Sequence, residues 1–474
     1  MLRLPPDQRA DLWRQVVAAL EQYETSVDHW RVSPKLDPEA LRSLLASCTF
    51  EMPMRPSDAL SFAINGLTRH QVHTPHPRYF GLFNPAPTTM GIAADALVAA
   101  FNPQLAAWSH SPLAAEIERH LVLAFGARFG WDVASVEGTF TSGGAEANHT
   151  GLLTALHQRF PEFAESGVRA LAGQPVLYGS AEGHHSVRKA ARLAGLGMSA
   201  LREIPVDEHL KMNCAELERR IVEDLAAGFI PFAIVATAGT TNAGVVDPLA
   251  DIAAVAERYG LWFHVDAAWG GAAALVPELR PVLAGIERAD SITFDAHKWL
   301  SVPMGAGIFL TRHRGALDRT FRVANAYMPR EAEGLDIADP YASSMQWSRR
   351  FIGLKVFLSL MVAGWGGYAA AIRHQTAMGD LLRQRLRERG WRVVNETPLP
   401  TVCFDAPELQ PGALREIATS VVESGEAWIS TTQVGAGRTV LRACITNHRT
   451  QPADVEALVV SLDRARAEAP ARRP

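Results

Sequence analysis

The chain has 474 residues, of which 48% are hydrophobic and 20% are charged, and its 46 basic and 50 acidic side chains give a net charge of −4. This is the composition of an ordinary globular protein with a sizeable core, and it excludes a fibrous or low-complexity chain. The near-neutral charge balance supplies no basic surface for nucleic acid, so we expect no nucleic-acid partner. The length corresponds to about three units of ordinary domain size, or to one large domain with appendages.

The cysteines and the apolar stretches bear on the compartment. Four cysteines lie far apart without a C-x-x-C pair, which predicts neither a disulfide framework nor a zinc site and fits a cytoplasmic protein. The start, MLRLPPDQRADLW, has no apolar core of a signal peptide. The longest apolar stretch, 356–372, has GWGG at its centre. We expect a buried helix that ends near Gly364, and no membrane partner.

Residues 1–90 are expected to form an N-terminal helical segment that ends in a loop. Apolar residues recur at helical spacing in 4–27 and again in 37–48. The segment 75–89, PHPRYFGLFNPAPTT, is rich in proline and aromatic residues and predicts a structured loop. A helical stretch, GIAADALVAAF, follows it.

Residues 91–350 are expected to form a large domain. Between 135 and 311, short apolar runs alternate with helical segments, which predicts an α/β fold with a mainly parallel sheet flanked by helices. Ligands in such folds bind beyond the carboxyl ends of the strands, and the unusual polar residues of this chain fall there. The expected strands are 175–180, 232–241, 261–268, 291–297 and 305–311.

Residues 351–474 are expected to form a smaller C-terminal α/β domain. A long helix and a second helical stretch, QTAMGDLLRQRLRERG, precede the short apolar runs WRVVN, TVCFD and TVLRACIT. The polar segment 312–350 reads as a loop that joins the two domains.

Two strand ends carry the residues that point most strongly to chemistry. DAHKWL places Lys298 beside His297 just past an apolar run, and HVDAAWGG ends another run with Asp266. A lone lysine is usually a surface charge. A buried carboxylate, however, is costly unless it meets a cation or hydrogen-bond donors. A carboxylate and an amine at neighbouring strand ends would bracket a flat cationic heterocycle.

Pyridoxal phosphate (PLP) explains both residues. Its aldehyde needs a lysine for a Schiff base, and its ring nitrogen needs an acid beside it to stay protonated. A phosphate site is also available, because TSGGAEANH predicts a glycine-bearing turn that runs into a helix. The backbone N–H groups of Gly144 and Ala145 would stand at its N-terminus. The chain contains neither G-x-x-x-x-G-K-[ST] nor G-x-G-x-x-G.

Two groups of histidines allow more than one interpretation. His184, in GHHSVRKAA, either caps a helix or stacks on a cofactor ring. His70, His73 and His76 resemble a metal cluster in spacing, but Pro75 breaks any helix there and we predict no metal site.

Taken together, the motifs resemble those of the group II amino-acid decarboxylases, fold-type I PLP enzymes that include aromatic-L-amino-acid, glutamate, cysteine-sulfinate and 2,4-diaminobutyrate decarboxylases. The resemblance runs from HPRYFG near residue 76 to LRACITNHRT at 441–450. Any one motif could arise by chance, whereas the ordered set is specific. The set is WSHSPLAAEIE, TSGGAEANH, HHSVRKAA, ATAGTTNAGVVDP, HVDAAWGG, ADSITFDAHKWL and SRRFIGLKVF.

The resemblance implies a role for each matching residue. Lys298 is similar to the Schiff-base lysine, Asp266 to the partner of the pyridinium nitrogen, and Ala268 to the small residue against one ring face. His184 resembles the histidine stacked on the other face, which favours its functional interpretation. Thr241 resembles the threonine near the ring hydroxyl, and His297 is expected beside the cofactor.

Three further matches concern the phosphate and the support of the site. Gly144 and Ala145 match the phosphate-binding turn, although many relatives have serine in place of the alanine. Asp295 stands where some relatives have asparagine near the phosphate. An ionised Asp295 would repel that anion, so we expect its side chain to turn away or the residue to contribute only its backbone. Asp247 resembles an acid that supports the site.

The family uses a loop tyrosine that returns a proton after CO2 leaves. Tyr341, in IADPYASSMQWSRRF, is the match that we favour, about one residue out of register with aromatic relatives, and Tyr327 is its competitor. The alternative for Tyr341 is a packing role.

The resemblance implies PLP-dependent decarboxylation of an L-amino acid to its amine, in a cytoplasmic homodimer with the active site at the interface. The alternatives are a decarboxylation-dependent aldehyde synthase, and a transaminase or another PLP lyase. A non-catalytic PLP-fold protein is disfavoured by the intact set Lys298, Asp266 and His184. The resemblance implies that the pocket is lined by residues of the loop 76–89, namely Tyr79, Phe80, Phe83 and Thr88. A basic residue near the C-terminal end, His448 or Arg449, either binds an acidic substrate or lies on the surface. The sequence leaves the amino acid open.

Overall fold

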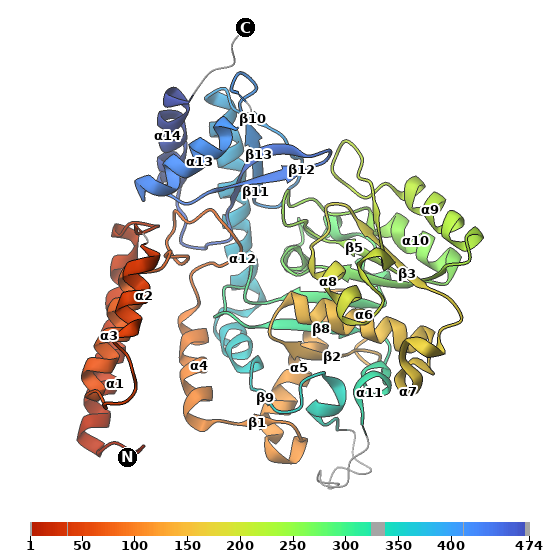
Figure 1. Cartoon of the computed structure of the whole chain (residues 1–474), viewed down its shortest axis with the longest axis horizontal. Coiled ribbons are helices and arrows are strands. Elements are labelled where there is room, and N and C mark those ends of the chain that lie inside the picture. The colour runs from red at the N-terminus through yellow and green to blue at the C-terminus, as the bar shows by residue number, and fades with distance from the viewer. Residues whose placement is uncertain (1, 36, 324–336, 411, 470–474) are drawn as a thin grey trace.

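The computed structural model of the chain describes residues 2–35, 37–323, 337–410 and 412–469. Figure 1 shows three parts: a group of N-terminal helices, a large sheet between helices, and a smaller sheet that carries the C-terminal helices. The predicted α/β class is confirmed. The domain boundaries at residues 90 and 350 stay predictions.

A seven-stranded sheet in the order β2-β8-β7-β6-β5-β3-β4 forms the centre of the large part. β3 to β7 pair in parallel, as expected, whereas β8 runs antiparallel to both of its neighbours. The strands are β2 (Glu137–Thr141), β3 (Pro175–Ser180), β4 (Leu201–Ile204), β5 (Ile230–Thr237), β6 (Trp262–Asp266), β7 (Ser291–Asp295) and β8 (Gly307–Thr311).

Helices cover both faces of this sheet, which is why its central strands are apolar along nearly their whole length. One apolar cluster lies between the sheet and α5, α9 and α10, and a second lies between the sheet and α6 and α8. The helices of the large part are α5 (Pro112–Arg128), α6 (Gly144–Arg159), α7 (Phe163–Ser166), α8 (Ser186–Leu193), α9 (Cys214–Ala226), α10 (Leu249–Tyr259) and α11 (Ala316–Phe321).

The register brings the ends of three parallel strands to one edge of the sheet. Thr237 of β5 pairs with Asp266 of β6, which in turn pairs with Thr293 of β7. Asp295 ends β7 two residues later, and Lys298 follows in the next turn. The predicted strands that end in polar residues therefore deliver those residues to a single place.

The smaller sheet is antiparallel, in the order β10-β11-β13-β12, and α13 and α14 pack on it around a separate apolar cluster. Its elements are β10 (Arg392–Val393), β11 (Thr401–Asp405), α13 (Ala413–Ser424), β12 (Ser430–Val434), β13 (Arg438–Cys444) and α14 (Pro452–Glu468).

α12 (Gly353–Glu388) connects the two sheets. At Gly364 its backbone has φ 61° and ψ 174°, so a first helical segment stops there, as expected, and a second continues. Its length and composition would allow it to cross a membrane, but it packs against α4, α5 and α14. Ile372, Leu382 and Leu386 of the second segment are fully buried. In the first segment Val356 is buried, but Met361 and Val362 are 67% and 70% exposed, so the expected burial of that segment is only partly met.

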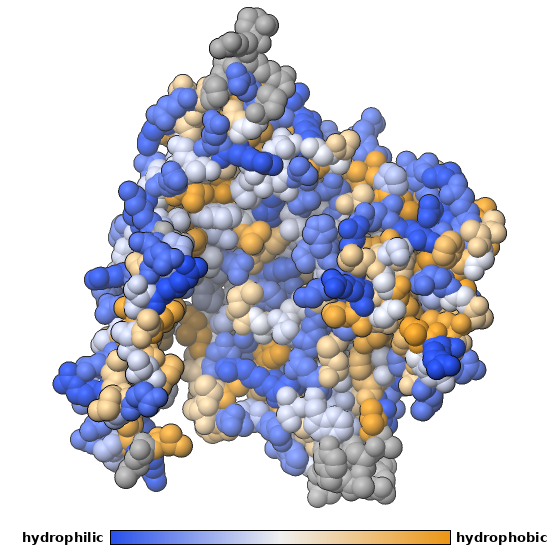
Figure 2. Space-filling model, viewed as in Figure 1, coloured by the Kyte–Doolittle hydropathy of each residue, from blue (hydrophilic) through white to orange (hydrophobic). Residues whose placement is uncertain are grey.

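The N-terminal helices lie against the body with little contact. α1 (Pro6–Ser26), α2 (Pro38–Ala46) and α3 (Pro56–Arg69) contain no buried residue, and Figure 2 shows open space between their lower part and the body. α4 (Thr89–Phe101) is packed on α12, and Thr88 caps its first turn. Next to it, β1 (Gln104–Leu105) pairs with β9 (Arg349–Arg350).

Candidate active site

A cavity of about 290 Å³ lies at the carboxyl ends of β5, β6 and β7, beside the start of α6. All eight residues predicted to bind the cofactor line it, although they come from distant parts of the sequence. They are Gly144, Ala145, His184, Thr241, Asp266, Ala268, His297 and Lys298.

Asp266 is a buried carboxylate held by neutral donors. Its side chain accepts hydrogen bonds from Asn148 Nδ2 at 2.7 Å and from the backbone N–H of Ala268 at 3.2 Å. It takes part in no salt bridge among the described residues, although it is only 4% exposed. A buried carboxylate with donors but without a cation suits a cationic ligand group, and the predicted ring nitrogen is such a group.

A hydrogen-bonded network of uncharged side chains holds the carboxylate of Asp266 in place. Asn148 accepts a hydrogen bond at 3.1 Å from Nε2 of His264, whose other nitrogen lies 2.8 Å from Ser291 Oγ. Burial lowers the pKa of His264 to about 4, so the ring is neutral and donates from Nε2. Asn148 and His264 were not predicted, although they lie within the motifs TSGGAEANH and HVDAAWGG. Asn148 stands one helical turn after Gly144, on the same face of α6.

His184 is positioned just before α8. The backbone N–H of Ser186 donates to His184 Nδ1 at 3.2 Å, and Ser186 Oγ lies 2.8 Å from the same nitrogen. Burial is the largest cause that lowers the pKa of His184, followed by the opposing effect of Asp266. The neutral ring therefore carries its proton on Nε2, where it is free to face a ligand.

Lys298 forms an ion pair within the cavity. Its Nζ lies 3.0 Å from Oδ2 of Asp295, which is 1% exposed. The expectation that Asp295 turns away is therefore wrong, because the lysine supplies a cation that the sequence argument had not placed there. His297 accepts a hydrogen bond from the backbone N–H of Ala306 at 3.2 Å, and burial is the main cause that lowers its pKa.

Asp247 is hydrogen-bonded to the end of β5, which borders the cavity. Its two oxygens accept 2.8 Å hydrogen bonds from the backbone N–H groups of Met212 and Thr237, the last residue of β5. Burial raises the pKa of Asp247 to about 6, and the two hydrogen bonds oppose the shift. The residue holds the strand end in place and does not line the cavity.

The residues present fit PLP by the chemistry of their donors. Asp266 offers an unpaired carboxylate, Lys298 an amine, and the start of α6 a glycine turn. At that turn a Cβ on Gly144 would come within 2.8 Å of Asp295 and 3.3 Å of Ala268. Gly144 thus leaves room that any other residue would fill.

Comparisons with known proteins agree with this fit. A family model described as the pyridoxal-dependent decarboxylase conserved domain matches residues 42–407. The chain belongs to the pyridoxal-dependent decarboxylase family. It is 30% identical over 459 residues to an aromatic-L-amino-acid decarboxylase from Bacillus atrophaeus, covering 95% of this chain and 93% of that protein. It is also 30% identical over 402 residues to an acidic amino acid decarboxylase from Bos taurus, covering 83% and 74%.

A solved structure extends the agreement to the fold. The crystal structure of Oryza sativa TDC with PLP and tryptamine superimposes with a TM-score of 0.92 at 25% identity, over 99% of each chain. The predictions of family, fold type I, PLP as cofactor and amino-acid decarboxylase activity are confirmed. The role of each site residue stays a prediction.

The loop 75–89 reaches the active site of this decarboxylase through one side chain. Phe83 stacks on Trp269 with ring centroids 4.6 Å apart, and Lys298 Nζ lies 5.8 Å from its centroid. The other expected pocket residues do different work. Tyr79 contacts Trp428, Phe80 is buried in the core of the small sheet, and Thr88 caps α4.

The two basic candidates at the C-terminal end are both engaged elsewhere. Arg449 forms ion pairs with Glu24 at 3.2 Å and Asp28 at 2.8 Å, which ties it to the N-terminal helices. His448 lies 3.4 Å from Ser301 Oγ, and burial lowers its pKa. Among the histidines suspected of metal binding, His73 contacts the Tyr23 hydroxyl at 3.1 Å.

Tyr341 is not brought to the cavity of Lys298. It lies in the short 3-10 helix Pro340–Ser343, 7% exposed, with its ring stacked on Trp347 at 4.9 Å. Its backbone N–H donates to the carbonyl of Ala106. This packing favours the alternative role that the sequence left open. The competitor, Tyr327, lies outside the described residues.

We expect Tyr341→Phe to leave the ratio of amine to aldehyde product unchanged, because the hydroxyl does not line the cavity. The matched variant Tyr327→Phe, made at the competing position, is expected to raise the aldehyde fraction. Quantifying both products by chromatography after single-turnover and steady-state reactions separates the two. A rise in aldehyde for Tyr341→Phe alone would restore that residue as the proton donor.

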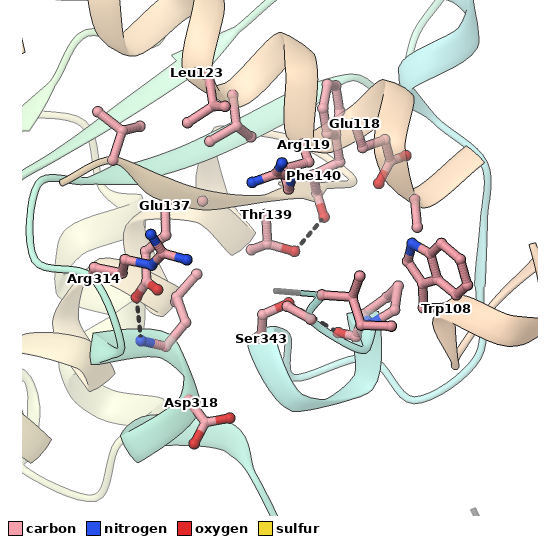
Figure 3. Close-up of a pocket in the computed structure, with 18 of the residues that line it drawn as sticks. Trp108, Glu118, Arg119, Leu123, Glu137, Thr139, Phe140, Arg314, Asp318 and Ser343 are labelled. Carbon is pink, nitrogen blue, oxygen red and sulfur yellow. Dashed lines mark hydrogen bonds between the residues drawn. The ribbon is translucent and has the colours of Figure 1, made fainter. Parts of the chain in front are cut away.

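A second, larger cavity of about 480 Å³ lies away from Lys298, between α5, β2, α11 and the 3-10 helix before β9 (Figure 3). Its acidic groups have partners. Glu118 pairs with Arg349 at 2.6 Å, and Glu137 accepts hydrogen bonds from two backbone N–H groups at the start of α11. None of the predicted site residues lines it. The smaller cavity therefore brings the predicted site residues together, although it offers less volume.

Proposed function

We propose that this decarboxylase converts an L-amino acid to its amine and CO2 with Lys298 as the residue that carries the cofactor. The observation that carries the proposal is that Lys298 and the unpaired carboxylate of Asp266 line one cavity. When bound, PLP supplies a protonated ring into which the electrons of the broken bond flow.

The surrounding residues bind and orient. In this proposal Asp266 keeps the ring nitrogen protonated. Because Asn148 already holds its carboxylate in place, the carboxylate does not have to reorient during the reaction. His184 and Ala268 confine the ring from its two faces. The turn at Gly144 and Ala145 binds the phosphate through backbone N–H groups. Thr241 and His297 complete the wall of the cavity.

A screen over amino acids tests the proposal. Two relatives of equal identity are named for aromatic and for acidic amino acids, so the panel must include both classes. We expect CO2 and amine in equal amounts without a keto-acid acceptor. A requirement for a keto acid would indicate a transaminase, and release of ammonia and peroxide would indicate an aldehyde synthase. Bound cofactor without turnover over the whole panel would support a non-catalytic protein.

We also propose a homodimer with the active site at the interface. The N-terminal helices contain no buried residue, and they expose Trp13, Val17 and Leu20 on α1 and Leu45 and Leu67 on α2 and α3. Such a face gains stability when a second copy covers it. Sedimentation velocity should give about twice the 51.5 kDa chain mass. A monomer at micromolar concentration would contradict this.

The four cysteines are free thiols, which is typical of a reducing compartment. We therefore propose a cytoplasmic location, and fractionation of cells that express the chain would check it.

A further inference from the structure

Asp295 is a buried carboxylate that the proposed reaction does not use. It ends β7 and is 1% exposed. Its Oδ2 pairs with Lys298 Nζ at 3.0 Å, while its Oδ1 has no hydrogen-bond partner. A buried acceptor without a partner costs free energy, so a native structure that keeps one has a use for it or completes it with a ligand.

The unsatisfied carboxylate stands at the proposed phosphate site. A Cβ built on Gly144, the first residue of α6, would lie 2.8 Å from Asp295 Oδ2. Asp295 and Gly144 line the same cavity. An ionised Asp295 and a phosphate dianion at this turn would therefore be close neighbours of like charge in a partly dry site.

The groups around Asp295 do not remove this conflict. Lys298 neutralises one negative charge, but the cofactor phosphate brings two more. The pKa values of His184 and His297 are lowered mainly by burial, so both rings are neutral above pH 7.5. Among the described residues, the other charged groups that face this part of the cavity or His297 are Asp266, Glu146 and Lys355.

We propose that Asp295 takes up a proton when the phosphate of the cofactor binds, so that capture of the cofactor is coupled to proton uptake. The protonated carboxyl then has an O–H to donate, which removes the repulsion and gives the group a hydrogen bond to the phosphate. Asp295 acts here as a positioning residue for the cofactor. The inference rests on the proposed function only in placing the phosphate at the turn of Gly144.

Binding of pyridoxine 5′-phosphate to the full-length apoenzyme tests this. This probe has the ring and phosphate but no aldehyde, so Lys298 forms no bond with it. Titration calorimetry between pH 7.5 and 9, in two buffers of different ionisation heat, counts the protons taken up. Phosphate monoesters are already dianions in this range, because their second pKa is about 6. We expect Asp295 to contribute up to one proton beyond any that the ring nitrogen gains beside Asp266, and this proton alone lowers the affinity by up to about tenfold per pH unit.

Asp295→Asn should take up about one proton fewer than the unmodified chain when it binds the probe, and its affinity should fall less steeply over the same range. The amide is neutral throughout, so only the ring nitrogen beside Asp266 can still gain a proton. The matched control is Asp405→Asn, which removes another buried, ion-paired aspartate at the end of a strand, in the small sheet. This control should keep the pH dependence of the unmodified chain.

Two results would overturn the inference: no proton uptake by the unmodified chain, or the same pH slope in Asp295→Asn. The first needs no variant, so misfolding of Asp295→Asn cannot hide it. Failure of the proposed function has a different signature. In that case PLP itself would give no absorbance band of lysine-bound cofactor with the unmodified chain, whatever the pH dependence of the probe.

Discussion

Lys298→Ala is expected to abolish decarboxylation, with kcat lowered by roughly 10³-fold or more, together with the visible absorbance of lysine-bound cofactor. Lys298 is the only lysine among the described residues that line the cavity, and the carboxylate of Asp266, which forms no salt bridge there, lines the same space. Without the amine, PLP can still contact the phosphate turn and Asp266, but no covalent bond fixes it or is exchanged for the substrate. CO2 release and the cofactor spectrum, measured on the same preparation, check both effects.

The chain offers a clean control because it contains five lysines. Lys189, exposed on α8, can be changed to alanine outside the cavity and should leave both readouts intact. Reduction of the cofactor complex with borohydride and mapping of the labelled peptide should place the label on Lys298. Label on any other lysine, or turnover in Lys298→Ala with its absorbance retained, would remove the central assignment.

The cofactor residues could be predicted from the sequence because parallel strands share a direction. The predicted strands ended in small or polar residues, and a parallel sheet brings such ends to one edge. Asp266 at the end of β6 and Lys298 after β7 therefore line one cavity although 32 residues separate them. The predicted family and cofactor followed from the same ordered motifs and were confirmed.

What the sequence did not predict depends on contacts that have no local pattern. Asn148 is a polar residue on the buried face of a helix, and only the fold shows that Asp266 and His264 are its partners. The orientation of Asp295 was mispredicted because repulsion from the phosphate was weighed without the ion pair to Lys298. Tyr341 was chosen by register along the chain, which does not show its packing on Trp347; its role stays a prediction.

The same limit applies to the sheet. A strand buried on both faces is an apolar run without alternation, and such a run carries no information on direction. The strand 305–311 was therefore predicted as β8 without its antiparallel pairing to β7. The helix break at Gly364 was predictable, because glycine readily adopts the positive φ of 61° that ends the first segment of α12.

Asp266→Asn is expected to lower kcat by roughly 10²- to 10³-fold while the cofactor still attaches to Lys298. Removing one partner of a buried charge pair costs about 3–5 kcal/mol, and each 1.4 kcal/mol in the barrier is about tenfold in rate. Part of that free energy destabilises the ground state and does not raise the barrier. The expected loss in kcat is therefore smaller than the whole of about 3–5 kcal/mol would give. Asparagine keeps the shape and can still meet Ala268 N–H, but it no longer stabilises a protonated ring.

The cofactor spectrum, the Kd for PLP and kcat measured together separate this electronic role from a structural one. Asp224→Asn is the matched control, since Asp224 is equally buried in the large part but pairs with Arg202 and Tyr178 away from the cavity. Asp224→Asn should keep the kcat of the unmodified chain, even if the variant is less stable. Full kcat in Asp266→Asn would mean that the ring keeps its proton without this carboxylate. The neutral side chains of Asn148 and His264 would then have only a structural role. Burying the Asp266 carboxylate without a cation would cost folding free energy and give no benefit to the reaction.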